Sequence, residues 1–321
     1  MFSFVEGVHL MVSGGPAALL TAVLSRWPAR SGRTPCLFLA DILINFVSIE
    51  SRTMKTVKCR REETPFRFAA VFAVAMGTIG SAWALQPLIT DDTGSQGAGG
   101  NQLEVSYSRD RTRGGGETER VHTVPVVYTY GLSDSVDIYA SVAWSRIRVT
   151  GNDASGLGNT VFGAKWRFFE NEASGTSLAI KPELAIPVSS SRERDGLGTG
   201  KTSGALTFIV SQDLPFGSIH FNAGIGRDRF READENPRTD YKRFSLAPVW
   251  DVSEQWKLAL DVGTESARAD GHTVRSKFAE IGAIYSPSKD VDLALGVIRT
   301  SDNENPKSTT HTLTGGVTWR F

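Results

Sequence analysis

The sequence has little cysteine, no excess of either charge and no long apolar run in its larger, C-terminal part. Its two cysteines, Cys36 and Cys59, both precede residue 85, so the rest of the chain cannot build a disulfide framework. Lysine plus arginine and aspartate plus glutamate each number 35, so no net charge attracts nucleic acid. No stretch after Leu85 has the ~18 consecutive apolar residues of a transmembrane helix. These absences exclude a disulfide-rich domain, a strongly basic nucleic-acid-binding chain and a helical membrane protein.

Residues 54–84 have the composition of a secretory signal peptide. The segment has a basic start between Lys55 and Arg67, an apolar run from about Phe68 to Ile79, and an Ala-x-Ala exit at Ala82–Ala84. These are the three parts of a cleaved export signal, and a buried helix is the alternative. We therefore expect cleavage after Ala84 and a mature chain that begins at Leu85.

Residues 1–53 do not fit in front of an export signal, which should itself be N-terminal. Their apolar stretch at 36–47 is short and is interrupted by Asp41, so it is a poor membrane anchor. We expect Met54 to be the true start and residues 1–53 to be an upstream extension that is absent from the mature protein. The remaining chain has 26 basic and 30 acidic residues and is slightly acidic.

Alternating apolar and polar residues dominate the chain after Leu85. In the segment 255–265, Trp256, Leu258 and Leu260 share one face, and Lys257 and Asp261 share the other. Such alternation over about ten residues, bounded by Gly, Asn, Asp and Ser, predicts a β-strand. The predicted strands are 102–108, 121–130, 136–148, 160–169, 177–188, 203–212, 218–225, 241–250, 255–265, 277–285, 290–297 and 309–321.

The connections between these strands alternate in length. Short turns at 131–135, 170–175, 214–217, 252–254 and 286–289 take turns with longer polar loops at 110–119, 150–159, 189–202, 230–240, 267–276 and 301–308. Short turns at one rim and long loops at the other are typical of transmembrane barrels, with the turns in the periplasm. An even number of strands would place both ends of the barrel there.

The predicted fold class is therefore all-β, a transmembrane antiparallel up-and-down β-barrel of about 12 strands over residues 102–321. A soluble barrel shows the same alternation with its faces exchanged, so alternation alone does not separate the two. The export signal, the asymmetry of the loops and the aromatic residues near strand ends favour the membrane barrel.

The charged faces of the strands line the lumen if the apolar faces contact lipid. Such charges either select solutes through their field and spacing, or pair across a narrow lumen and fill it, and the sequence leaves both open. The candidate lumen residues are Glu104, Lys165, Arg167, Lys181, Glu183, Lys257, Asp261, Glu265 and Glu280.

The segment LQPLITDDTGSQGAGGNQLEVSYS, which begins at Leu85, resembles the start of mature proteins in the outer-membrane family called Putative MetA-pathway of phenol degradation. The resemblance continues in 130–141 and in 156–168, where Asn159 stands in place of the more usual Asp. It implies a barrel of Gram-negative outer membranes with a Gly-rich N-terminal segment, 85–101, and a name linked to the uptake of aromatic compounds. It assigns no catalytic residue and no cofactor. The motif positions are Pro87, Thr90, Asp91, Asp92 and Gly94.

Two motifs have alternative interpretations. The adjacent carboxylates Asp91 and Asp92 can bind a cation or a basic group, or they can serve as turn residues in an N-terminal segment that is periplasmic or plugs the lumen. The segment Gly196–Gly204 is similar to a phosphate-binding loop, but Asp195 stands where that motif needs its first glycine. We predict that this segment is a flexible extracellular loop.

The expected function is an outer-membrane channel for passive uptake of small solutes, aromatic or otherwise apolar ones included. The alternatives are a non-conducting structural or adhesin-like barrel and, third, an outer-membrane hydrolase, for which Asp270-Gly271-His272 is the nearest candidate. We predict no metal site. The expected partners are outer-membrane lipid, the solute and the barrel assembly machinery, and not nucleic acid. That machinery would recognise the terminal strand, with Trp319 and Phe321 as the assembly signal.

Overall fold

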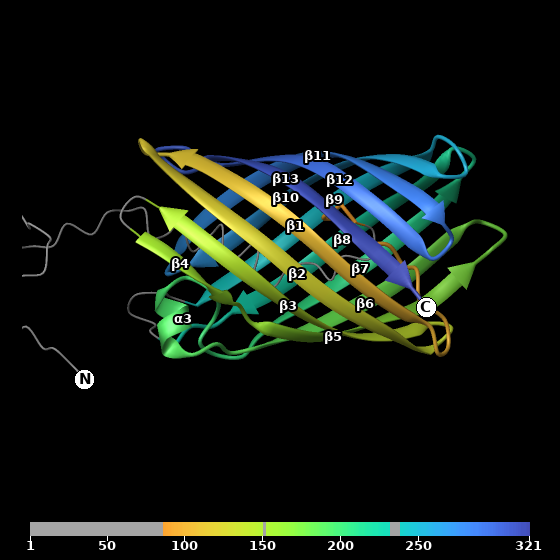
Figure 1. Ribbon diagram of the computed structural model, residues 1–321, viewed down its shortest axis with the longest axis horizontal. Coiled ribbons are helices and arrows are strands. Elements are labelled where there is room, and N and C mark those ends of the chain that lie inside the picture. The colour runs from red at the N-terminus through yellow and green to blue at the C-terminus, as the bar shows by residue number, and fades with distance from the viewer. Residues whose placement is uncertain (1–85, 150–151, 232–237) are drawn as a thin grey trace, which may run out of the picture. The chain divides into compact units, whose positions relative to one another are not determined.

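The computed structural model describes residues 86–149, 152–231 and 238–321. Those residues form thirteen β-strands and one short helix (Figure 1). None of their helices is long and apolar enough to cross a membrane. The predicted upstream extension, 1–53, and the predicted signal peptide, 54–84, lie outside the described residues.

The strands follow one another along the chain. Their bounds are β1 Asn101–Gly114, β2 Glu117–Ser133, β3 Val136–Val149, β4 Asn152–Leu157, β5 Thr160–Asn171, β6 Thr176–Ile186, β7 Ser203–Leu214, β8 Gly217–Asp228, β9 Thr239–Asp251, β10 Trp256–Ala269, β11 His272–Ser288, β12 Val291–Asp302 and β13 Thr309–Arg320. The helix α3, Ser190–Arg194, lies between β6 and β7.

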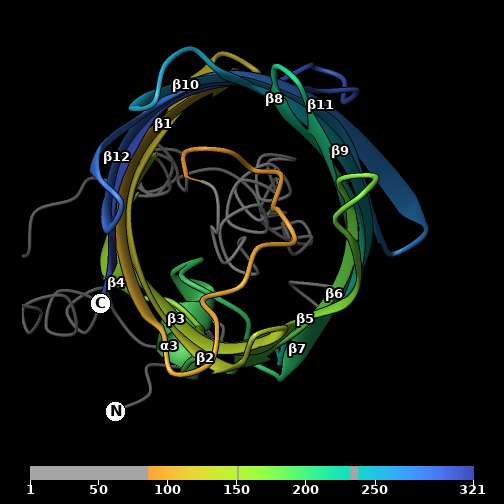
Figure 2. The same ribbon diagram turned by 90° about the vertical axis from the view of Figure 1, so that its right-hand side faces the viewer.

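The sheet closes on itself, as Figure 2 shows in end view. Each strand pairs antiparallel with its neighbour, and β1 pairs with β13 from Gln102↔Arg320 to Arg113↔Thr309. Strand β3 pairs with β5 near one end and with β4 near the other, so β4 and β5 share one position in the wall. The described strands therefore make a closed barrel with twelve positions, which confirms the predicted fold class.

The two faces of the wall have opposite character. Large apolar side chains point outward and are exposed, among them Leu184, Ile281 and Leu295 at 58%, 70% and 66%. Charged side chains such as Asp261 point inward and are buried. A soluble barrel would bury the apolar set, so this arrangement suits a wall that faces lipid.

The two rims differ in their connections. We call the end with the connections after β2, β5, β7, β9 and β11, together with Asn101 and Phe321, the turn rim. The opposite end, with the connections after β1, β3, β6, β8, β10 and β12, is the loop rim. The turn rim lies at the right of Figure 1, beside the C-terminus.

Three of the predicted long loops, 110–119, 150–159 and 267–276, are wrong, and the second of them contains strand β4. Strands β1 and β2 continue to a turn at Gly115 and Gly116, and β10 and β11 continue to a turn at Asp270 and Gly271. All four turn residues have positive φ, which suits tight hairpin turns. The sequence shows no clear alternation of apolar and polar residues at these strand ends, because the side chains on their outward face are polar.

Candidate functional site

The N-terminal segment, residues 86–100, lies inside the barrel, as the orange trace in Figure 2 shows. Leu88 is 1% exposed and packs with Ala247, Val249 and Ala259 of β9 and β10. Pro87 lies over Gly282, where an added Cβ would come within 2.9 Å of the proline ring. The segment therefore occupies the lumen, and these small wall residues leave room for it.

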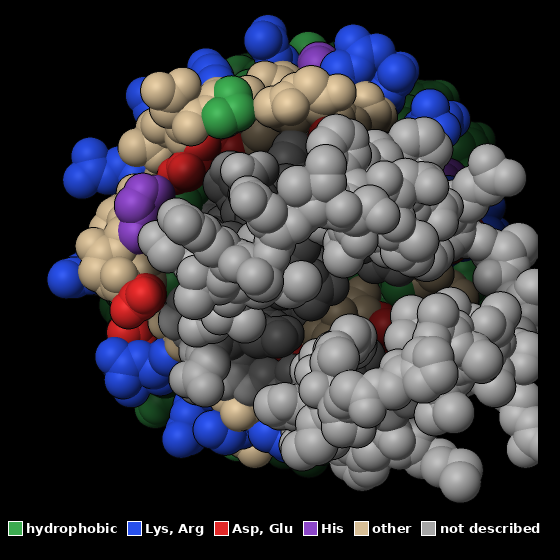
Figure 3. Space-filling view, turned by 90° about the vertical axis from the view of Figure 1, so that its left-hand side faces the viewer, with side chains coloured by type: hydrophobic (Ala, Val, Ile, Leu, Met, Phe, Trp, Pro, Cys, Tyr) green, Lys and Arg blue, Asp and Glu red, His purple; other side chains and the backbone are tan. Residues whose placement is uncertain are grey.

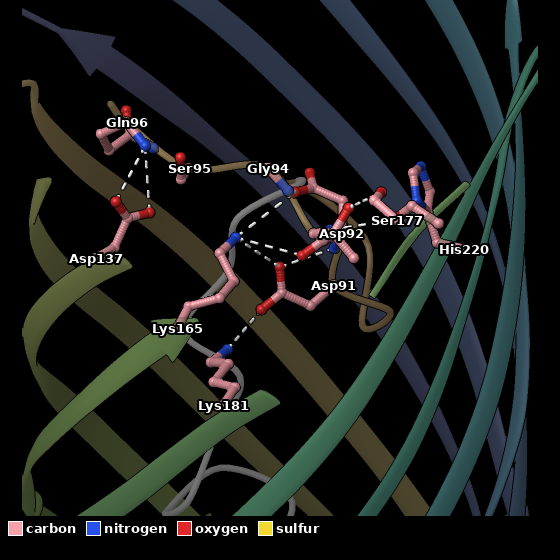
Figure 4. Close-up of polar contacts among 12 residues, drawn as sticks. Asp91, Asp92, Gly94, Ser95, Gln96, Asp137, Lys165, Ser177, Lys181 and His220 are labelled. Atoms are coloured by element: carbon pink, nitrogen blue, oxygen red, sulfur yellow. Dashed lines mark hydrogen bonds and ion pairs between the residues drawn. The ribbon is translucent and has the colours of Figure 1, made fainter. Parts of the chain in front are cut away.

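Asp91 binds two lysines of the barrel wall (Figure 4). Its Oδ2 lies 2.7 Å from the Nζ of Lys181 on β6, and its Oδ1 lies 3.6 Å from the Nζ of Lys165 on β5. All three side chains are buried. Of the two interpretations of these adjacent carboxylates, the binding of a basic group fits Asp91.

Asp92 completes a tight turn beside this ion pair. Its Oδ1 accepts a hydrogen bond from the Gly94 amide at 2.6 Å and lies 3.5 Å from the Nζ of Lys165. Burial raises the pKa of Asp92, but the charges of Lys165 and His220 and the Gly94 hydrogen bond together lower it by more. The pKa of this carboxyl therefore lies below its ordinary value, and the carboxylate stays ionised.

Further polar contacts fasten the segment on opposite sides of the lumen. The amide and the hydroxyl of Thr90 each donate to the carboxylate of Asp261 on β10 at 2.7 Å. The amide of Gln96 donates to the carboxylate of Asp137 on β3 at 3.1 and 3.2 Å. The segment thus crosses from β10 to β3, so any pathway through the lumen must pass beside it.

The nine candidate lumen residues fall into two groups. Seven are buried and face the lumen: Glu104, Lys165, Lys181, Glu183, Asp261, Glu265 and Glu280. The other two lie at the turn rim, where Arg167 pairs with Glu170 at 3.3 Å and Lys257 pairs with Asp251 at 3.1 Å. Long basic side chains near a strand end reach the aqueous rim, so these two are far from the lumen centre.

Several buried carboxylates escaped the sequence analysis. Glu119, Asp137 and Asp228 are each no more than 1% exposed. Glu119 falls in a predicted loop and Asp228 lies beyond the predicted end of its strand, so neither had a predicted face. Asp137 lies on a predicted strand, where the inward parity of β3 could have revealed it. With them, carboxylates outnumber basic groups among the described residues that line the lumen.

The connection between β6 and β7, where Gly196–Gly204 was predicted to be a flexible extracellular loop, folds inward and is held against the wall. Leu197 packs with Val121 and Ile147 of the wall. The side-chain amide of Asn159 donates to the carbonyls of Ile186 and Thr199 and accepts from the Thr199 amide, at 2.6, 3.0 and 2.7 Å. This amide fastens the loop against the barrel beneath the loop rim.

One histidine makes contacts that sequence reasoning missed. Ser211 contacts the Nδ1 of His220 at 2.8 Å, and Ser218 contacts its Nε2 at the same distance. Both ring nitrogens thus face hydroxyls, whereas the histidine of a Ser-His-acid triad is oriented by a carboxylate. Ser211 also accepts from the Thr93 amide, so this group holds the N-terminal segment. His272, in the hydrolase candidate Asp270-Gly271-His272, is exposed at the loop rim, and its Nδ1 lies 3.9 Å from the Oε1 of Glu304.

The closed wall, its inverted faces and the polar, segment-filled lumen together define an outer-membrane β-barrel. The sequence from 81 to 320 matches the family described as "Putative MetA-pathway of phenol degradation". The chain belongs to this family, as its N-terminal motif predicted. No curated protein matches the sequence.

Solved structures share the fold. An outer membrane channel from Pseudomonas putida F1 is 16% identical and has a TM-score of 0.57, over 72% of this chain and 98% of that chain. The NanC porin is 10% identical with a TM-score of 0.48, over 67% of this chain and 98% of the porin. At 16% identity, the similarity to the Pseudomonas putida channel establishes the barrel fold and not the solute.

Proposed function

We propose that the protein is a passive outer-membrane channel for small solutes, aromatic ones included, and that the pathway runs beside the N-terminal segment. The observation that carries this proposal is the polar attachment of that segment, through Thr90, Asp91 and Gln96, to three parts of the wall. A segment held by ion pairs and hydrogen bonds can leave polar gaps, whereas a close-packed apolar plug would seal the lumen.

A cavity beside the segment supports such a pathway. It lies between the segment and strands β1, β2, β3, β5 and β6. Its lining consists of Asp91, Gln96, Gln102, Glu104, Thr129, Asp137, Tyr139, Lys165 and Lys181. We propose that Glu104, Lys165 and Lys181, the predicted lumen residues within this lining, set the selectivity here. The excess of carboxylates would favour neutral and cationic solutes over anions.

We also propose the direction of insertion and the route of export. The loop rim would face the outside and the turn rim the periplasm, as in other outer-membrane barrels. Residues 54–84 would be removed as a signal peptide after Ala84, and residues 1–53 would be absent from the mature chain. The match to the family, which begins at residue 81, supports a mature domain that starts near this point.

A non-conducting structural barrel is the second candidate, because the lumen is filled from both rims. The N-terminal segment crosses it, and the loop held by Asn159 covers part of it beneath the loop rim. In this alternative the charged side chains pair with the segment and stabilise it, and no solute passes.

Release of two matched aromatic ions from liposomes that contain the refolded protein separates these candidates. Phenyltrimethylammonium and benzenesulfonate have the same ring and opposite charges, and neither crosses lipid readily. We expect phenyltrimethylammonium to leave at least several times faster than benzenesulfonate, because carboxylates dominate the lumen. Release of neither ion above the level of protein-free liposomes would refute the channel, and faster release of the anion would refute the proposed selectivity.

A further inference from the structure

The outward face of β1 changes from apolar to basic toward the loop rim. Leu103, Val105 and Tyr107 occupy this face near the turn rim, and Arg109, Arg111 and Arg113 continue it, all three exposed. Strand β3 makes the same change, from Val142 and Trp144 to Arg146 and Arg148. These basic side chains are thus on the face that contacts lipid, at the level where the apolar surface ends.

Strand register places the basic side chains next to one another. Directly paired positions run across five strands in the order Arg299 on β12, His311 on β13, Arg111 on β1, Arg120 on β2 and Arg148 on β3. We call these five residues the basic row. Side chains at directly opposed positions have Cβ atoms about 5 Å apart, and like charges so placed repel each other. Figure 3 shows lysine and arginine side chains around this rim.

Carboxylates of the described chain neutralise little of this charge. Asp153 lies 3.5 Å from Arg148 and 2.7 Å from Arg146, just beside the row. Among the described residues, Arg109, Arg111, Arg113 and Arg120 form no ion pair. A cluster of cations that repel one another and lack partners within the chain is stabilised when an anion binds to it.

The height of the row identifies where that anion lies. From Phe321 at the turn rim to His311 in the row, β13 advances ten residues. With a rise of about 3.3 Å per residue and a tilt of about 40°, this distance is about 25 Å along the barrel axis, which is the height of the apolar band of such barrels. His311 therefore lies near the headgroup level of the leaflet beneath the loop rim, which is the outer leaflet in the proposed direction of insertion. Because paired positions run at right angles to the tilted strands, the row crosses this level from β12 to β3.

We propose that the basic row binds the phosphate groups of lipopolysaccharide, the phosphorylated glycolipid of the outer leaflet. Guanidinium groups bind phosphate oxygens in bidentate fashion, and a row of four arginines and a histidine offers several such sites side by side. The acyl chains would lie below it against the outward apolar side chains, such as Tyr107 and Trp144, which are exposed. The site lies on the outer wall, so it is independent of the pathway in the lumen.

Lipid binding by the refolded protein in detergent, followed by native mass spectrometry, tests the site. The probes are bis-phosphorylated lipid A and the same lipid without phosphates. We expect the wild type to bind the phosphorylated lipid at concentrations about tenfold lower or more, and raised salt to reduce this difference. Equal binding of the two lipids by the wild type would overturn the proposal without any need for a variant.

Substitution then locates the site. In Arg111→Gln/Arg120→Gln, the half-saturating concentration of phosphorylated lipid A should rise by roughly tenfold or more, because both arginines lie in the row. The matched control, Lys242→Gln/Lys277→Gln, removes two exposed basic side chains on β9 and β11 whose paired neighbours, Ile225, Ser266, Thr264 and Ser301, are uncharged. It should bind as the wild type does. An equal loss in both variants would show that net charge, and not the row, attracts the lipid.

Discussion

Asp91 is the residue on which the attachment of the N-terminal segment most depends. Its carboxylate lies between Lys165 and Lys181, with side chains of all three no more than 7% exposed. The parity of the strands predicted that both lysines face the lumen, and the motif singled out Asp91. That they meet was not predictable, because the path of a segment without regular structure depends on contacts with strands 70 to 90 residues away.

Removal of one partner of this buried ion pair should lower the free energy of unfolding by more than removal of one partner of an exposed ion pair. We expect Lys181→Met to lower the free energy of unfolding by about 3–5 kcal/mol, because it leaves a buried carboxylate with a weaker partner. Lys257→Met, which breaks an exposed pair with Asp251, should cost less than about 1 kcal/mol. Urea unfolding in detergent, followed by tryptophan fluorescence, measures both.

The double variant Asp91→Asn/Lys181→Met supplies the control for this interpretation. Its loss of stability should fall short of the sum of the two single losses by about 1 kcal/mol or more, because the two groups interact directly. Additive losses would contradict a direct ion pair between the segment and the wall.

Among the elements, the positions of the strands were predictable from the alternation of apolar and polar residues, and the positions of the loops were not. All twelve predicted segments overlap observed strands, because an apolar face toward lipid forces a two-residue period. Strand ends were missed where the outward face turns basic, as at Arg109–Arg113 of β1. The inward fold of the β6–β7 loop escaped prediction because it depends on Asn159, 40 residues from its partner Thr199.

Loss of the Asn159 side chain should therefore free the loop while leaving the barrel intact. In Asn159→Ala, three hydrogen bonds worth about 1 kcal/mol each are lost, so trypsin should cleave at Arg192 or Lys201 about tenfold faster or more. The control Asn171→Ala removes an amide that caps an exposed turn at the other rim. Equal cleavage rates of the wild type and Asn159→Ala would show that Asn159 does not hold the loop.

At the scale of the whole molecule, the seam between β1 and β13 closes the barrel. Its last backbone bonds join Asn101 and Phe321 in both directions, at 3.1 and 3.0 Å. The rings of Trp319 and Phe321 lie 4.5 Å apart on the outward face. Closure leaves no unpaired strand edge in lipid, where each unsatisfied backbone group costs several kcal/mol. Closure was predictable from the sequence, and the filling of the lumen was not.

Deletion of Phe321 should lower the yield of inserted barrel before it affects any activity. The deletion removes one backbone pair of the seam and an outward aromatic ring that we propose the assembly machinery recognises. Phe216→Ala is the control, because it removes an exposed aromatic side chain at the same rim but away from the seam. The amount of heat-modifiable protein in outer-membrane fractions measures assembly. Undiminished insertion after the deletion would contradict the role of the terminal residue.

Single-channel conductance tests whether solutes pass beside the polar N-terminal segment through a lumen rich in carboxylates. We expect the wild type in planar bilayers to show a small, cation-selective conductance. The variant Thr90→Ala/Asp91→Asn, which loses contacts of the segment to Asp261 and Lys181, should conduct more. Absence of conductance in both proteins would contradict the account and identify a closed structural barrel.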